Sequence, residues 1–492
     1  MQMMNRRLKE LRGAIARQSE RTILLSTVLL VSAFSAAMGY LLTQCFAVDV
    51  ISSHLAIPQD CDLDWSTPVG RHCFSDYGAV VSTGSRSNPW EPYLYLPWAN
   101  QPSGNQYPAA AMLPHMLFGL PAKWLGAPLL GLIGYLLALT IAVLSPAVWA
   151  ARGARGLERV VVFVALGAAA VPAWAVIDRG NSVGFVVPIA LVFLVALRRR
   201  RWGLVAIMVV LAALVKPQFA VLVIALFAVR QWRLGGLAFV GVVASNIAAY
   251  LLWPRNFPET IAQTLHNIST SSGPGITDIR NVSFGRALLL MPDMVKAVQT
   301  GGKIPDGFLA GPRSLLGYGV LAIFVVSVLA LGRRIPPVLV GVVLLASAVL
   351  CVPHANHYYL AFALAVAALA VRDPGGQPGA GIFDQLSTES DPRRLVGICV
   401  TLAAALSIAQ TALPGPVLQV PIFGQMGAKG VIGNTTIVQT TLFVTPFLWL
   451  IACAAIIVSY ARRPAPSDGN DPGRLAEAPT NTTVSPPRVR PS

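Results

Sequence analysis

Long apolar runs separated by short polar turns occupy the chain from about residue 22 to residue 460. A helix that crosses about 30 Å of hydrocarbon at about 1.5 Å per residue needs about 20 apolar residues. The pattern predicts an all-α polytopic membrane protein of about 12 transmembrane or re-entrant helices. The predicted segments are 22–46, 127–149, 159–177, 183–197, 203–215, 218–229, 235–253, 314–332, 336–352, 357–371, 395–413 and 437–460.

The run 203–229 is ambiguous, because it fits one long helix or two short helices that meet at Lys216-Pro217. Two helices place all the basic clusters on one side of the membrane, whereas one helix splits them between both sides. The positive-inside rule therefore favours two helices and cytoplasmic N- and C-termini in a multi-pass plasma-membrane protein. The clusters are Arg152/Arg155/Arg159, Arg198 to Arg201, Arg230/Arg233, Arg333/Arg334, Arg393/Arg394 and Arg462/Arg463.

This topology divides the chain into three parts. Residues 1–21 form a basic cytoplasmic N-terminus, 22–460 the transmembrane domain, and 461–492 a cytoplasmic tail whose Pro-rich composition predicts disorder. The first apolar run is too long for a typical signal-peptide core and is expected to be a signal anchor. Two large loops, 47–126 and 254–313, lie outside, and the linker 372–394 lies inside.

Composition supports the membrane assignment and limits the functions. Hydrophobic residues make up 55% of the chain and charged residues 12%, about half the share of an average soluble protein. The net charge of +16 sits in short clusters between apolar runs, without the aromatic-interleaved stripe of nucleic-acid binders, so no nucleic-acid partner is expected. Cys61 and Cys73 share an oxidising loop that permits a disulfide, and no Cys/His set has zinc spacing, so no metal or cofactor is predicted.

The first outer loop combines carboxylates with aromatic residues, including Asp76, Trp90 and Tyr107. Aromatic rings stack on sugars and carboxylates accept hydroxyl hydrogen bonds, although an interfacial aromatic belt with solvated acids explains the same composition. Asp76 begins a mostly uncharged stretch. A carboxylate near an apolar surface has a raised proton affinity and can act as a general base.

Further polar groups stand where a membrane makes them costly. Lys216 ends an apolar run and either marks a phosphate site or snorkels to the outer interface. Arg179 and Asn181 follow the outer end of a span, where Arg179 and the preceding acid could simply pair. His354 and His357 begin a later span beside Tyr358, and histidine can transfer a proton or bind phosphate.

The order of these motifs resembles glycosyltransferase family 87, the actinobacterial GT-C membrane enzymes. The matching elements are Asp76-Tyr77, Tyr107-Pro108-Ala109, Gly180-Asn181, Lys216-Pro217, Arg230-Gln231-Trp232-Arg233 and His357-Tyr358, over roughly residues 70–370. The chain departs from the family pattern at Ala109, where a second Pro is usual, and before His357, where a Ser-Pro pair is missing. These departures leave open whether His354 or His357 is the counterpart; His357 is preferred.

The resemblance implies a GT-C fold with an extracytoplasmic active site. The expected reaction moves mannose, another hexose or arabinofuranose from a polyprenyl-phosphate donor to a cell-envelope glycolipid or glycan acceptor, with inversion. Asp76 would be the catalytic base, and His357 and Lys216 would steady the leaving phosphate. His354, Tyr358, Arg179 and Asn181 complete the phosphate-binding candidates, and Tyr77, Trp90 and Tyr107 the sugar or acceptor candidates. The alternatives are a transporter or flippase of lipid-linked sugars, for which no internal repeat is visible, and a non-enzymatic membrane subunit.

Overall fold

The computed structural model describes residues 18–46, 74–92, 104–277, 280–301, 304–305, 307–387, 393–423, 429–439 and 441–462. Cys61 and Cys73, residues 47–73 and 93–103 of the first outer loop, and nearly all of the predicted disordered tail lie outside these residues.

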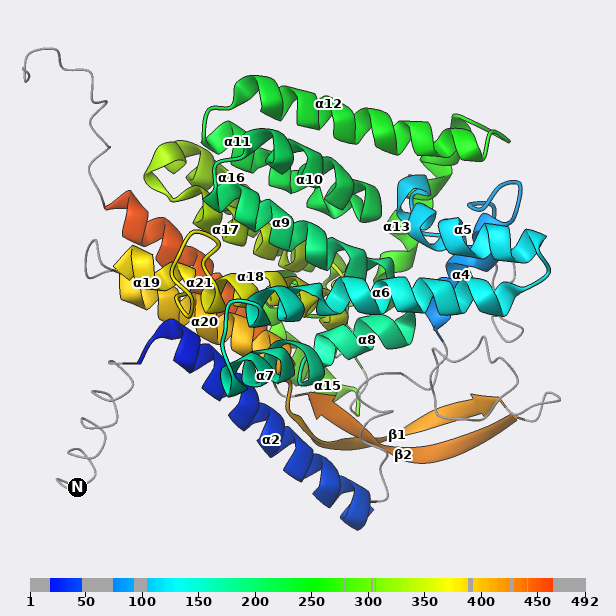
Figure 1. Cartoon of the computed structure of the whole chain (residues 1–492). Helices are drawn as coiled ribbons and strands as arrows, with labels where there is room; N and C mark the ends of the chain where they lie inside the picture. Colours follow the sequence, from blue (N-terminus) through cyan, green and yellow to red (C-terminus); the bar gives the residue numbers. More distant parts are fainter. Residues whose placement is uncertain are drawn as a thin grey trace, which may run out of the picture.

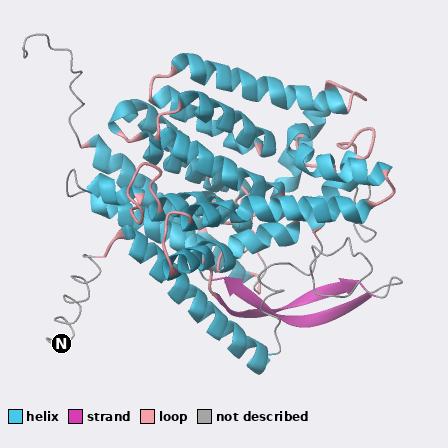
Figure 2. Cartoon of the chain, viewed as in Figure 1, coloured by secondary structure: helices cyan, strands magenta, loops and turns pink. Residues whose placement is uncertain are grey.

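The described chain is a bundle of helices with one β-hairpin (Figures 1 and 2). Its first half contains α2 (Glu20–Phe46), α4 (Ser75–Gly84), α5 (Ala109–Trp124), α6 (Pro128–Ala151), α7 (Leu157–Phe163), a π-helical turn (Val164–Ala168), α8 (Val171–Arg179), η3 (Ser182–Phe185), α9 (Val186–Arg198), α10 (Trp202–Val215), η4 (Pro217–Val223), α11 (Ile224–Ala228) and α12 (Trp232–Ala249), which a short turn (η5, Tyr250–Leu252) extends. The second half contains α13 (Glu259–Gly275), α14 (Phe284–Leu288), α15 (Leu290–Gln299), α16 (Ala310–Leu331), η6 (Gly332–Arg334), α17 (Pro337–Leu350), η7 (His357–Ala361), α18 (Phe362–Val371), α19 (Ile382–Ser387), α20 (Arg393–Ile408), β1 (Ala412–Phe423), β2 (Lys429–Gln439) and α21 (Thr441–Ala461).

The predicted membrane helices are present as apolar helices. Among the described residues, five helices are long and apolar enough to cross a membrane, and a sixth crossing is possible if the bent pair Leu157–Ala168 and Val171–Arg179 forms one span. Shorter apolar helices cover the other predicted segments: Ser182–Arg198, Trp202–Val215, Pro217–Ala228, Pro337–Leu350, His357–Val371 and Arg394–Ile408. A membrane-spanning helical protein is thus supported, and the number of crossings stays a prediction.

Outer helices expose apolar side chains, which distinguishes this bundle from a soluble one. Only 17% of the most apolar 18-residue stretch of α16 is buried. Its side chains Leu315, Ile323 and Val326 are all more than half exposed. A long apolar face of this kind is stable against lipid and unstable against water. We infer that α16 faces hydrocarbon.

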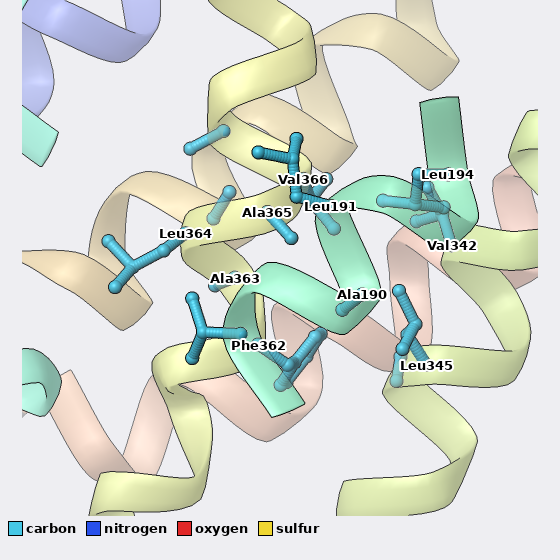
Figure 3. Packing of buried hydrophobic residues seen from close by; sticks show 14 of the residues in the cluster. Ala190, Leu191, Leu194, Val342, Leu345, Phe362, Ala363, Leu364, Ala365 and Val366 are labelled. Carbon is cyan, nitrogen blue, oxygen red and sulfur yellow. The ribbon is translucent and has the colours of Figure 1, made fainter. Parts of the chain in front are cut away.

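Inner helices are apolar all round and form the core. Every residue of α18 is buried, and it packs against α9, which in turn contacts α17. Figure 3 shows Leu191 and Leu194 of α9 near Val342 and Leu345 of α17 and Phe362 to Val366 of α18. A helix without a polar face is expected in such a position, because neither side of it meets water.

The chain reverses at Lys216-Pro217, so the two-helix interpretation of 203–229 is confirmed. Arg200 and Trp202, at the start of α10, line the same cavity as Arg230 and Trp232, which follow α11. A continuous helix over these residues would separate its ends by about 40 Å at about 1.5 Å per residue. Lys216 is extended (φ −148°, ψ 112°), as expected for a residue before proline.

The β-hairpin between α20 and α21 was not predicted. Strands β1 and β2 pair antiparallel, with Ala412 opposite Gln439 and Phe423 opposite Lys429 (Figure 2). The fold is therefore mainly rather than entirely α-helical.

Candidate functional site

The candidate site lies at the end of the bundle where α4 and α5 are drawn, opposite the end that carries α19 (Figure 1). Asp76 stands in the first turn of α4, where the helix dipole favours a carboxylate. Arg179 stands in the last turn of α8, where the dipole favours a cation. The two helix ends thus carry the charges that their own backbones stabilise.

Asp76 and Arg179 form a bidentate ion pair. Arg179 Nε is 3.1 Å from Asp76 Oδ2, and its Nη2 is 3.2 Å from Oδ1. Asn181 Nδ2 donates a third hydrogen bond to Oδ2 at 2.7 Å. Both charged side chains are mostly buried, with 14% of Asp76 and 17% of Arg179 exposed.

The surroundings keep Asp76 ionised. Burial raises the pKa of its carboxyl, but the charge of Arg179 and the hydrogen bonds from Arg179 and Asn181 outweigh burial, so the pKa lies below its ordinary value. The raised proton affinity expected from the sequence is therefore wrong, because the sequence did not show Arg179 beside Asp76.

Gly180 and Asn181 form the turn between α8 and η3, and each residue type suits its position there. Gly180 ends α8 with φ 63°, a left-handed conformation that glycine adopts without steric cost. Asn181 Oδ1 accepts from the Val183 amide at 2.9 Å and caps η3. Because that bond fixes the side-chain amide, Nδ2 must point toward Asp76, and it also lies 3.3 Å from Tyr107 Oη.

Lys216 is buried at the site rather than extended to the interface. Its side chain comes from the break between α10 and η4, the residue is 6% exposed, and Nζ lies 4.2 Å from the ring centre of Tyr107 and 5.8 Å from that of Tyr359. Cation–π contacts of this geometry stabilise a desolvated ammonium. The snorkelling interpretation of Lys216 is therefore wrong.

The 353–359 segment also reaches the site, through Tyr358. The Arg179 guanidinium lies 5.3 Å from the Tyr358 ring centre, and Asn356 Nδ2 donates to Tyr358 Oη at 3.1 Å. His354 Nε2 lies 3.3 Å from Asn356 Oδ1. His357 is buried, with its ring centre 5.9 Å from that of Tyr358, so it packs beside the tyrosine that contacts Arg179.

Trp90 and Tyr77 are buried residues that pack next to the site. Trp90 is fully buried against Tyr250 and Trp253, and its indole donates to the Tyr107 carbonyl at 2.9 Å. Tyr77 is 3% exposed, with its ring centre 4.8 Å from that of Tyr135. In this conformation neither ring offers a face on which a sugar could stack.

The sequence reasoning missed two residues that hold the turn. His115 Nε2 lies 3.1 Å from the Gly180 carbonyl, which also accepts from Tyr135 Oη at 2.9 Å. Burial, and to a lesser degree the charge of Lys216, lowers the pKa of His115 to about 3, so the ring is neutral and must carry its proton on Nε2. A histidine in the apolar helix after Tyr107-Pro108 was the available signal.

The assembled groups could bind an anionic ligand. The charges of Arg179 and Lys216 both act on a single carboxylate, Asp76, and the phenol oxygens of Tyr107 and Tyr358 lie 3.3 Å and 3.5 Å from Asn181 Nδ2. A second cation beside an ion pair leaves positive charge that a phosphate could balance. No protein-family profile, curated protein or solved structure matches this chain.

Proposed function

We propose that the protein is an integral-membrane GT-C-like glycosyltransferase with about 12 transmembrane or re-entrant helices. It moves mannose, another hexose or arabinofuranose from a polyprenyl phosphate to a cell-envelope glycolipid or glycan. The observation that carries the proposal is the convergence of Asp76, Arg179, Asn181, Lys216 and Tyr358 from distant parts of the chain. Asp76, Asn181, Lys216 and Tyr358 lie in motifs that resemble those of glycosyltransferase family 87, and Arg179 was a candidate from its place at the end of a span.

In the proposed reaction, Asp76 accepts the proton of the acceptor hydroxyl as that oxygen forms a bond to the anomeric carbon. The bond from that carbon to the phosphate oxygen breaks on the opposite face, which inverts the configuration. The electron pair leaves with the polyprenyl phosphate, whose charge Lys216 and Arg179 balance.

In this proposal, binding of the donor activates Asp76 as a base by weakening its ion pair with Arg179. Arg179 lowers the proton affinity of Asp76 in the structure described. A donor phosphate near Lys216 would compete with Asp76 for the guanidinium, and a weakened ion pair would raise the proton affinity of the carboxylate. Binding of the donor therefore prepares Asp76 to accept the proton.

The experiment is transfer from labelled polyprenyl-phosphate mannose and arabinofuranose in membranes that contain the Asp76→Asn protein. We expect activity to fall by about 100-fold or more, the usual contribution of a general base, at unchanged protein level. Glu91→Gln is the matched control, because Glu91 is an exposed acid beyond the same helix. It should retain activity.

Full activity of Asp76→Asn would remove Asp76 from the mechanism. Flux of lipid-linked sugar in proteoliposomes without any product would favour the flippase. Retained function after conservative replacement of Asp76, Lys216 and His357, with loss after loop deletion, would favour a non-enzymatic subunit.

A further inference from the structure

A cavity of about 1210 Å³ opens at the end of the bundle opposite Asp76. Three interhelical turns surround it: the turn from α9 to α10, the turn from α11 to α12 and the turn from α16 to α17. This end carries the basic clusters of the sequence. The cavity shares no residue with the site around Asp76.

The polar lining of the cavity is positively charged. Arg200, Arg230, Arg333 and Arg334 line it, and no Asp or Glu is among the described residues that do so. Four guanidinium groups around one cavity create a positive potential, so an anion that enters the cavity is stabilised. Arginine forks match the geometry of a phosphate.

Two of these arginines occupy backbone positions that favour glycine. Arg200 has φ 55° and Arg230 has φ 63°, and each follows the last turn of a helix. The Arg201 amide donates to the Ala196 carbonyl at 2.8 Å, and the Gln231 amide donates to the Leu226 carbonyl at 2.9 Å. Each of these hydrogen bonds joins the last residue of a six-residue segment to the first, which defines a Schellman cap. The left-handed position of such a cap is usually Gly.

The third turn uses glycine at its positive φ. Gly332 has φ 47°, and Arg333 and Arg334 follow it into the cavity. Arginine at two strained positions around one cavity suggests that its charge is needed there, because strain of this kind gathers at binding sites.

The cavity continues into a lipid-facing surface. Trp202 and Trp232 line it, and Trp232 is 62% exposed, as expected for indoles at a membrane interface. Leu329 also lines it and begins an exposed apolar stripe on α16 that runs through Val326 and Ile323. Residues three apart lie on one helix face, so the stripe leads from the cavity along the predicted membrane span.

We propose that this cavity binds the phosphate headgroup of an anionic membrane lipid, with the arginines on the phosphate and an acyl chain along the stripe on α16. A free phosphate shares the headgroup chemistry but would gain nothing from the stripe. Basic pockets between helix ends are known to take such headgroups.

The first test is native mass spectrometry of the full-length protein in nonionic detergent, titrated with phosphatidylglycerol or with phosphatidylcholine of the same chains. Arg230→Gln/Arg334→Gln should weaken the tightest phosphatidylglycerol site by about 30-fold, about fivefold per arginine. The matched control is Arg201→Gln/Arg233→Gln, which removes two charges beside the cavity without touching its lining. It should change affinity by less than about threefold.

A second variant separates binding from stability. Arg200→Gly/Arg230→Gly relieves the left-handed strain, so the protein should unfold at a higher temperature in phosphatidylcholine while it binds phosphatidylglycerol about 30-fold more weakly. A purely structural role for these arginines would leave the affinity unchanged.

An equal loss of phosphatidylglycerol affinity in the Arg201→Gln/Arg233→Gln control would overturn the proposal, since it would show that the whole basic surface attracts the lipid. Unchanged affinity in both cavity variants would also overturn it. Inorganic pyrophosphate that displaces phosphatidylglycerol at equal concentration would show that the cavity serves free phosphates and would refute the lipid assignment.

Discussion

Asp76 differs from a surface carboxylate because donors already occupy both of its oxygens. Arg179 contacts each oxygen, and Asn181 adds a bond to Oδ2. A carboxylate held in this way is fixed in direction and remains charged at neutral pH. The proposed role of Asp76 as a base and its contribution to stability therefore both depend on its ion pair with Arg179.

That ion pair predicts a pH-dependent stability difference between the native protein and Asp76→Asn. The folded pKa of Asp76 lies below its ordinary value, so the pair stabilises the fold above the pKa of an unfolded aspartate, about 3.9, and loses this contribution as pH falls through the folded pKa. Asn leaves Arg179 without its carboxylate at a cost of about 1–3 kcal/mol. Thermal unfolding in detergent should show a constant gap from about pH 8 to pH 5 that narrows below about pH 4.

Arg255→Gln is a control, because the Arg255 side chain donates to the Ser87 hydroxyl at 2.8 Å rather than forming the ion pair at Asp76. Its stability relative to the native protein should not vary with pH below about 5. A gap for Asp76→Asn that widens in acid would contradict the assigned direction of the pKa shift.

At the scale of elements, α15 and α16 are joined by a buried ion pair. Arg313, fully buried in the first turn of α16, pairs with Asp293 of α15, whose side chain is 3% exposed, and Nη1 donates to Asp293 Oδ2 at 3.0 Å. Arg313 Nε also donates to the Phe308 carbonyl at 3.0 Å. The ion pair therefore fixes the entry into α16.

Asp293→Asn should destabilise the protein by about 3–5 kcal/mol, because it leaves the Arg313 charge buried without its counterion. The measurement is the denaturation midpoint in detergent. The double change Asp293→Leu/Arg313→Met removes both charges and should recover most of the loss. If the double variant is less stable than Asp293→Asn, the cost arises from packing rather than from the unpaired charge.

The apolar helices could be predicted from the sequence because hydrocarbon demands long apolar runs, and all the predicted segments contain helix. The hairpin could not be predicted in the same way. Its strands carry prolines and glycines, as in Leu413-Pro414-Gly415-Pro416, which are typical of loops. The pairing of residues as far apart as Ala412 and Gln439 also produces no local repeat of apolar positions in the sequence.

Some residues of the candidate site could likewise be predicted from the sequence, and others could not. Asp76, Arg179, Asn181, Lys216 and Tyr358 were predicted because polar groups next to apolar runs are conspicuous. The partners of the Gly180 carbonyl were missed, since His115 and Tyr135 bond a backbone atom and no spacing reveals that. Trp90 was assigned to sugar because composition shows an aromatic ring and not its burial.

At the scale of the whole molecule, the two ends of the bundle differ in chemistry. One end brings Asp76, Arg179 and Lys216 together. The other carries the arginine cavity and the linker after α18, where Arg198 pairs with the buried Asp373 at 2.7 Å and Arg372 donates to the Trp149 carbonyl at 2.6 Å. Positive charge at one end of a helical bundle is the pattern that orients a membrane protein.

This asymmetry predicts which residues can be labelled from outside the cell. In a variant whose six cysteines are replaced by Ser, Ser87→Cys marks the end with Asp76, and Gly203→Cys and Gly375→Cys mark the arginine end. A side chain at Gly203 or Gly375 meets no atom within 4 Å, so neither change should disturb the fold. A membrane-impermeant maleimide should label Ser87→Cys in intact cells and the other two only after permeabilisation, because arginine-rich turns are retained in the cytoplasm. The reverse pattern would place Asp76 in the cytoplasm, where an acceptor outside the membrane could not reach it, and the proposed transferase would be refuted together with the orientation.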